Sequence, residues 1–224
     1  PALKPFTAIP QTLLKQMPMT SQPDSSPQKI VLASGNKGKL KEFNQLLGES
    51  GFEVIPQTDF DYEEAVEDGL SFVENAIIKA RHACQHTGLP AIADDSGLAV
   101  DALQGRPGIH SARFAGPNAS DADNNQKLLN SLAGLQNSER GARFHCVLVY
   151  MRHCEDPTPI ICHGSWEGQI LQQLSGTNGF GYDPLFYIPA LNCASAELSK
   201  EEKNKISHRG RALTELMRQL CPAA

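Results

Sequence analysis

A short apolar segment with two adjacent aspartates constrains the fold of this chain more than any other feature. Residues 89–100 read LPAIADDSGLAV, with a proline near the start and a glycine after the acidic pair. An apolar run bounded in this way predicts a buried strand. Asp94, Asp95 and Ser96 should stand where that strand ends, the edge at which open α/β sheets bind ligands. The segment alone is equally consistent with a solvated turn.

The length of the chain allows one well-buried domain. The 224 residues carry a formal net charge of −5, and no apolar run approaches the roughly 18 residues that a membrane span needs. An acidic protein lacks the many cationic contacts from which non-specific nucleic-acid affinity arises. We therefore expect no membrane and no nucleic-acid partner. Six scattered cysteines without a C-x-x-C pair or a signal peptide predict free thiols and a cytoplasmic location.

The first 28 residues differ in composition from the rest. They contain six of the 15 prolines, no glycine and only three charged residues. A segment of this kind cannot bury an apolar core. We expect residues 1–28 to be a disordered extension, or sequence added ahead of the domain, and residues 29–224 to form the folded domain.

A glycine- and lysine-rich loop follows the first predicted strand, residues 29–34, and precedes an apolar-periodic helix. Backbone N–H groups, a helix N-terminus and lysines at such a loop favour a phosphate. The loop is not a Walker A motif, because two residues rather than four separate its glycines. A plain turn with solvent-facing lysines would have the same composition. The residues of this candidate phosphate loop are Ser34, Gly35, Asn36, Lys37, Gly38 and Lys39.

A capping box marks a helix ahead of the acidic strand. Ser71 and Glu74 have the S-x-x-E spacing of a helix start. Lys79 lies on a face beside the apolar stripe of this helix and can therefore reach a ligand that the helix borders. His82 and His86 have the spacing of a zinc site but lack the intervening glutamate of zinc proteases, so a surface pair is the simpler interpretation.

A glycine-rich loop at residues 176–184 surrounds an aromatic side chain. Its three glycines allow the backbone to expose Phe180, whose flat face can stack on a ring, with Asp183 alongside as a hydrogen-bond acceptor. An ordinary hairpin loop that buries Phe180 has the same composition.

The last predicted helix opens with two cationic or titratable residues, His208 and Arg209. Cations are stabilising near the C-terminus of a helix, so their place in the first turn favours an anionic or carbonyl-bearing ligand. Between these segments, residues 105–113 are too rich in glycine and proline for a helix. Residues 121–135 predict a helix, and residues 143–151 and 160–170 predict an antiparallel pair of long strands.

Five segments, in order along the chain, together resemble the inosine/xanthosine triphosphate pyrophosphatase family. The segments are SGNKGK at 34–39, EDGLSFVENAIIK at 67–79, ADDSG at 93–97, GFGYDP at 179–184 and KNKISHRG at 203–210. The resemblance covers residues 29–220. It implies an α/β fold in which a long twisted mixed sheet spans two lobes, with flanking helices, a cleft between the lobes and a homodimeric assembly.

The resemblance also implies a reaction, the Mg²⁺-dependent hydrolysis of ITP, dITP and XTP to the monophosphate and pyrophosphate, which removes deaminated purines from the nucleotide pool. By matching position, Asp95 resembles the proton acceptor and a metal ligand, and Glu67 a second metal ligand. Phosphate and sugar contacts are implied for Ser34, Gly35, Asn36, Lys37, Gly38, Lys39, Ser96 and Lys203, and a base pocket for Phe180, Gly181, Tyr182, Asp183, His208 and Arg209.

The residue types agree with this chemistry. A net-acidic protein must offset the charge of a triphosphate locally, and Mg²⁺ with Lys39, Lys79 and Lys203 can supply that charge. Successive strand side chains point to opposite faces. Only one of Asp94 and Asp95 should therefore lie fully in the site, and we choose Asp95.

Selectivity for the base follows from donors and acceptors. A 6-keto purine presents an acceptor that His208 or Arg209 can satisfy, whereas adenine would place a donor there. Two other function classes stay open at this point: a different phosphohydrolase or nucleotide kinase, weakened by the missing Walker pattern, and a non-catalytic nucleotide sensor, which would not need Asp95. The phosphorus species released from ITP separates the three.

Overall fold

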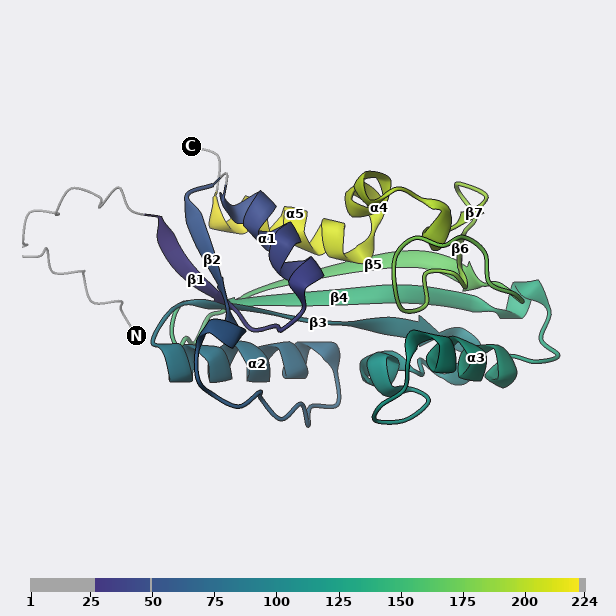
Figure 1. Ribbon diagram of the computed structural model, residues 1–224, viewed down its shortest axis with the longest axis horizontal. Helices are drawn as coiled ribbons and strands as arrows, with labels where there is room; N and C mark the ends of the chain where they lie inside the picture. The colour runs from purple at the N-terminus through teal and green to yellow at the C-terminus, as the bar shows by residue number, and fades with distance from the viewer. Residues whose placement is uncertain (1–26, 49, 222–224) are drawn as a thin grey trace, which may run out of the picture.

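The computed structural model describes residues 27–48 and 50–221, and one seven-stranded mixed sheet organises this part of the chain (Figure 1). β1 pairs in parallel with β2 and β3, and the remaining neighbours are antiparallel. The strands, in spatial order β2-β1-β3-β4-β5-β6-β7, are β1 Gln28–Leu32, β2 Phe52–Pro56, β3 Ala91–Val100, β4 Gly141–Met151, β5 Ile160–Ile170, β6 Phe186–Ile188 and β7 Cys193–Ala194.

Helices cover both faces of the sheet, which confirms the expected mixed α/β fold with flanking helices. α1, α4 and α5 lie on one face, and α2 and α3 lie on the other (Figure 1). The helices are α1 Lys37–Gly48, α2 Phe72–Thr87, α3 Asp121–Ser131, α4 Lys200–Ile206 and α5 His208–Leu220, and the short 3-10 turns are Gln57–Asp59, Asp101–Leu103, Gly108–Arg113, Asn137–Glu139 and Ser195–Glu197.

The long strands β3, β4 and β5 run through two separately packed ends of the molecule. At one end, apolar side chains of α1 and α5 pack on one face and those of α2 pack on the other. At the opposite end, a third cluster joins Leu128 of α3 to the aromatic side chains of Phe144, Trp166 and Phe186. Trp166 is 3% exposed and belongs to this apolar cluster. The arrangement gives the two-lobed sheet that the resemblance implies.

Local capping signals determine where several helices begin. The Ser71 side chain accepts a hydrogen bond from the Glu74 backbone N–H, and Ser199 and Glu202 form a complete capping box ahead of α4. Ser207 caps α5 through the backbone N–H of Gly210. The helix start predicted at Ser71 is therefore confirmed, although the Glu74 carboxylate accepts from Ser71 Oγ and the Leu70 N–H and the box is incomplete.

Several predicted boundaries and one predicted loop are wrong, and the helix predicted over residues 121–135 ends at Ser131. β3 continues past the acidic pair to Val100, because β4 pairs with it along its whole length. The glycine loop ends earlier than expected, because the Asn36 side chain accepts from two backbone N–H groups and starts α1 at Lys37. Residues 108–113 form a 3-10 helix rather than open loop.

The expected extension, residues 1–28, lies outside the described residues except for its last two, and Gln28 already belongs to β1. Within the described ranges, no helix is long and apolar enough to cross a membrane. All six cysteines lie in that part of the chain, and each is a free thiol.

Candidate active site

The site is organised around an open edge of β3. β1 ends at Leu32, so it pairs with β3 only at Ala91 and Ile92. Beyond Ile92, no described strand neighbours β3 on that side. Asp94 and Asp95 lie on this unpaired stretch, directly after Ala93. The functional edge is therefore created by the end of β1, and not, as the sequence predicted, by the end of β3.

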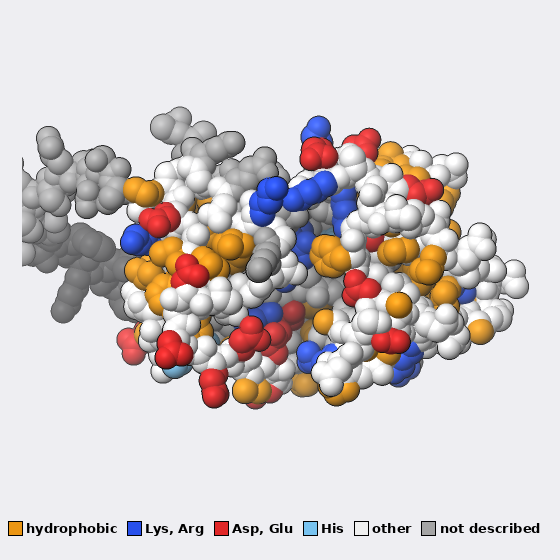
Figure 2. All heavy atoms as spheres, viewed as in Figure 1, with side chains coloured by type: hydrophobic (Ala, Val, Ile, Leu, Met, Phe, Trp, Pro, Cys, Tyr) orange, Lys and Arg blue, Asp and Glu red, His pale blue; other side chains and the backbone are white. Residues whose placement is uncertain are grey.

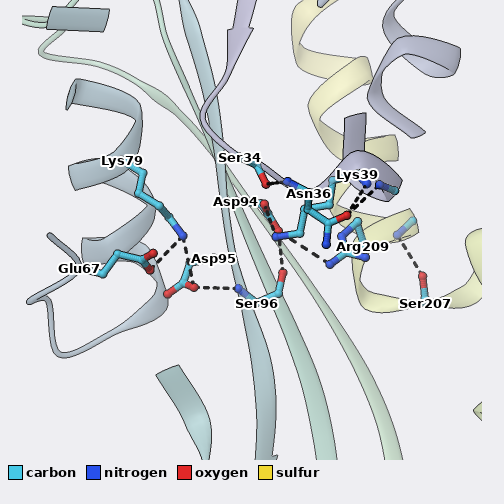
Figure 3. A network of polar contacts seen from close by, with 12 residues as sticks. Ser34, Asn36, Lys39, Glu67, Lys79, Asp94, Asp95, Ser96, Ser207 and Arg209 are labelled. Carbon is cyan, nitrogen blue, oxygen red and sulfur yellow. Dashed lines mark hydrogen bonds and ion pairs between the residues drawn. The ribbon is translucent and has the colours of Figure 1, made fainter. Parts of the chain in front are cut away.

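Asp94 faces α1 and α5. Its carboxylate accepts hydrogen bonds from Lys39 Nζ at 2.8 Å and from Ser96 Oγ at 3.1 Å, and Arg209 Nη2 lies 3.8 Å from it (Figure 3). Burial raises the pKa of Asp94, but the charges of Lys39, Arg209 and Lys79 outweigh burial and hold this pKa below its ordinary value. Asp94 is therefore a permanently charged anchor between two helices.

Asp95 faces α2, where a lysine lies between two carboxylates. Lys79 Nζ lies 3.6 Å from Asp95 Oδ1 and donates to Glu67 Oε2 at 3.0 Å, while Asn75 Nδ2 donates to Asp95 Oδ2 at 3.3 Å (Figure 3). Burial and the charge of Glu67 raise the pKa of Asp95, against the opposing effect of Lys79. The pKa of Lys79 is raised as well, because the neighbouring carboxylates outweigh its burial. Asp95 is thus the better proton acceptor of the two aspartates.

A cavity of about 180 Å³ opens between the end of β1 and α2. Ser34, Gly35 and Lys39 line one side, and Glu67 and Lys79 line the other. The surface is hollowed between the two ends of the molecule, with lysine and arginine side chains beside aspartate and glutamate (Figure 2). Opposite charges therefore share the walls of this cavity.

Side chains of the candidate phosphate loop accept hydrogen bonds from the loop's own backbone. Asn36 Oδ1 accepts from the backbone N–H groups of Gly38 at 2.9 Å and Lys39 at 3.1 Å, and Ser34 Oγ accepts from the Asn36 N–H at 3.2 Å. Three backbone N–H groups of the loop, which were expected to face an anion, are thus engaged within the loop. Lys37 opens α1, and its side chain is outside the described part.

The second glycine-rich loop presents an aromatic ring. Phe180 is 56% exposed, so the alternative in which the hairpin buries it is wrong. Lys203 Nζ lies 5.1 Å and Arg209 Cζ 5.8 Å from the centroid of its ring. These distances are within the range of cation–π attraction. The ring is therefore flanked by two cations and offers a flat face.

Tyr182 and Asp183, which follow Phe180, point into the protein and fix the loop through hydrogen bonds. Asp183 is buried, and its carboxylate accepts from the Phe180 backbone N–H, Ser195 Oγ and Lys203 Nζ. Tyr182 is buried in the third apolar cluster, and its hydroxyl donates to the Ser111 carbonyl at 2.8 Å. Of the side chains predicted from this loop for the base pocket, Phe180 alone is exposed.

His208 is buried at the start of α5. It stacks on Phe144 with ring centroids 4.7 Å apart, and its Nδ1 has no hydrogen-bond partner among the described residues. Burial, aided by the charges of Arg209 and Lys203, holds the pKa of His208 well below its ordinary value, so the imidazole is neutral. Its closeness to the sheet depends on Gly164 of β5, where a side chain would overlap the His208 carbonyl.

Arg209 connects the two halves of the site. Its guanidinium lies between the Asp94 carboxylate and the Phe180 ring. The acidic, phosphate-loop and aromatic residues predicted from the sequence are therefore connected through side-chain contacts. Phe180 and Arg209 do not line the cavity of about 180 Å³ and lie beyond Asp94.

Several residues of the site went unpredicted. Asn75 is buried and contacts Asp95, and no sequence signal gave it a role in the site. Tyr62 stacks on His86 at 5.0 Å, which packs the acidic loop against α2. The two helix histidines are thus part of an aromatic stack, and in the described part of the chain no three His, Cys, Asp or Glu side chains converge on a metal position.

Comparison with known proteins gives one family throughout. Residues 30–219 match the model of the Ham1 family. The dITP/XTP pyrophosphatase of Vibrio parahaemolyticus is 61% identical over 193 residues, which cover 86% of this chain and 96% of the relative. The protein of the same name from Yersinia pseudotuberculosis is 62% identical over 186 residues, covering 83% and 94%. A solved HAM1 protein from Coxiella burnetii is 52% identical with a TM-score of 0.84, covering 88% of this chain and 100% of that one. The chain therefore belongs to the Ham1 family.

Proposed function

We propose that this chain hydrolyses non-standard purine nucleoside triphosphates, ITP, dITP and XTP, to the monophosphate and pyrophosphate. The observation that carries the proposal is a chain of contacts from Lys79 and Asp95, through Ser96, Asp94 and Arg209, to the exposed ring of Phe180. It combines a proton acceptor, cations and an aromatic platform. Relatives about 60% identical are named dITP/XTP pyrophosphatase, which supports dITP and XTP as substrates.

In this proposal the triphosphate lies in the cavity beside β1. Lys39 and Lys79 line that cavity from opposite sides and offset phosphate charge, which a protein with a net charge of −5 must do locally. Ser34 supplies a hydroxyl at the same wall. Lys203, next to the Phe180 ring, stands closer to the sugar and base.

We also propose that Glu67 and Asp95 hold Mg²⁺. Both donors are carboxylates, and hard cations prefer oxygen ligands. The Lys79 ammonium, 3.0 Å from Glu67 and 3.6 Å from Asp95, indicates that the space between them suits positive charge. Mg²⁺ often binds through one or two carboxylates together with substrate phosphates, so a pair is sufficient. When bound, the ion contributes positive charge against the phosphate oxygens.

Asp95 acts as the proton acceptor in this scheme. A water molecule loses a proton to the Asp95 carboxylate as its oxygen bonds to phosphorus, and the anhydride bond between the α and β phosphorus atoms breaks to release pyrophosphate. The raised pKa of Asp95 favours acceptance of the proton. The hydrogen bond from Asn75 holds the carboxylate in place.

Base selectivity comes from the donors near Phe180. Arg209 offers N–H donors next to the ring, and the neutral imidazole of His208 can donate one hydrogen bond. A 6-keto group accepts such bonds, whereas the 6-amino group of adenine would oppose donor to donor. We expect ITP and XTP to be preferred over ATP for this reason.

One assay tests the proposal. The purified chain is incubated with Mg²⁺ and ITP, XTP, GTP or ATP, and the phosphorus product is identified. Pyrophosphate released from ITP and XTP, with little from ATP, is the expected result. Orthophosphate as the product would favour a different phosphohydrolase. Tight binding of ITP without turnover would instead favour a nucleotide sensor, and either outcome rejects the proposal.

The homodimer and the cytoplasmic location are further parts of the proposal. Both rest on the resemblance, and the location also rests on the free thiols of all six cysteines, which suit a reducing compartment. Sedimentation of the purified chain tests the assembly, and a mass twice that of the 24.3 kDa chain is expected. A monomer at micromolar concentration would reject the dimer and leave the chemistry of the site unaffected.

A further inference from the structure

The first turns of α3 hold the backbone that carries Phe180. The Gly181 N–H donates to Asp121 Oδ2 at 2.6 Å, and Asn125 Nδ2 donates to the Gly181 carbonyl at 2.8 Å. Both polar backbone atoms of the residue next to Phe180 are thus bonded to one helix. Asp121 and Asn125 come about 60 residues earlier in the chain.

The loop needs such a restraint. Glycines with positive φ flank the ring on both sides, +79° at Gly179 and +60° at Gly181, and glycine has the widest choice of backbone conformations. Phe180 itself is 56% exposed, so burial in the core does not fix its ring. Besides the flanking cations Lys203 and Arg209, the hydrogen bonds of the neighbouring backbone restrain the loop: the Phe180 N–H to Asp183 on one side, and Gly181 to α3 on the other.

α3 is itself anchored independently of the loop. Asn124 accepts from the Ala115 N–H at 2.8 Å and donates to the Ala112 carbonyl at 3.2 Å. Leu128 is fully buried in the third apolar cluster. Asn125 also donates to the Asp121 carbonyl at 2.8 Å, which ties the two loop contacts to each other. The position of α3 is therefore fixed without the loop, and its hydrogen bonds can hold Gly181 in place.

We infer that Asp121 and Asn125 are positioning residues that set the Phe180 ring for base recognition. The inference deepens the proposed function and rests on it. Both residues act through the Gly181 peptide. Their loss frees the ring and weakens base binding, while Asp95 and Lys79, which belong to the other half of the site, keep their geometry.

The experiment compares Asp121→Ala and Asn125→Leu with the wild-type full-length chain. The KM for ITP and the Kd of IMP, measured by calorimetry, should each rise about fivefold, as expected for one hydrogen bond of about 1 kcal/mol. The kcat should change less than twofold. Asp121→Asn keeps a side-chain acceptor and should recover most of the affinity.

Asp123→Ala is the matched control. Asp123 lies in the same turn and caps the helix through Ser120, and none of its hydrogen bonds reaches Gly181. It should lower the melting temperature without raising the KM. If the control raises KM as much as Asp121→Ala does, the effect comes from helix stability and the inference is overturned.

A double-mutant cycle with Phe180→Ala gives the decisive result. Because Asp121 acts on base binding through the Phe180 ring, Asp121→Ala should add little to the loss of affinity already caused by Phe180→Ala. Equal effects in both backgrounds would overturn the inference while wild-type turnover of ITP keeps the proposed function. Wild-type protein that neither turns over ITP nor binds IMP would reject both.

Discussion

Asp94 and Asp95 occupy successive positions of β3 and therefore point to opposite faces of the sheet. The consequence is a division of roles between neighbours. Asp94 is fully buried between cations of α1 and α5, and its charged form is stabilised. Asp95 faces a lysine and a second carboxylate, and its charged form is disfavoured. The alternation of strand side chains predicted that the two would differ, and tertiary contacts decided how.

Isosteric substitutions should separate these roles. We expect Asp94→Asn to lower the free energy of unfolding by about 3 kcal/mol, because it leaves Lys39 and Arg209 without their buried anion. The value lies at the low end for a buried pair because the Lys39 side chain is 20% exposed. Asp95→Asn should leave stability nearly unchanged and lower kcat at least about 100-fold. Chemical denaturation and ITP turnover measure the two quantities, and an active Asp95→Asn enzyme would exclude Asp95 as the proton acceptor.

At the scale of elements, α5 packs unusually close to β5. Gly164 leaves room for this approach, because a methyl group there would overlap the backbone of His208 and Ala212. His208 and Arg209, in the first turn of α5, thereby come close to Phe144 and Asp94. The position of the base-side residues thus depends on a glycine in the middle of a strand, which the sequence did not mark as special.

Gly164→Ala tests this dependence. Overpacking at the contact should lower the free energy of unfolding by about 2 kcal/mol and displace the start of α5. The KM for ITP should rise several-fold, because His208 and Arg209 move with the helix. Gly48→Ala, at the end of α1, is the control, since an added methyl there meets no described atom within 4 Å. A stable Gly164→Ala protein with unchanged KM would show that the close packing has no role in the site.

At the scale of the whole molecule, the buried, neutral His208 makes the free energy of unfolding depend on pH. The pKa of His208 is held well below its ordinary 6.5 by burial. Below about pH 6.5 the unfolded chain therefore binds a proton that the folded chain does not, and stability falls as the pH falls. His145 has a pKa lowered by burial and contributes in the same direction.

We expect the free energy of unfolding to decrease between pH 7 and pH 5, with a contribution from His208 that approaches about 1.4 kcal/mol per pH unit. His208→Gln should remove that part of the slope. Urea denaturation at several pH values measures it, with His153→Gln in the exposed β4–β5 hairpin as the control. An identical slope in the His208→Gln protein would mean that the imidazole titrates normally in the folded state.

The sequence by itself determined much of the fold: the capped helix starts at Ser71 and Ser199, the long antiparallel pair β4–β5, and the order of five motifs that indicates the family. These signals are local or periodic, so a few neighbouring residues are enough to produce them. The sequence also predicted most of the residues that meet at the site.

Only the tertiary structure decided how those residues meet. The open edge of β3 exists because a separate strand, β1, ends beside Ile92. The loop around Phe180 depends on Asp121 and Asn125, and α5 depends on Gly164. Each of these relations joins groups far apart in the chain, and hydrogen bonds and steric fit between distant segments leave no periodic pattern in either segment alone.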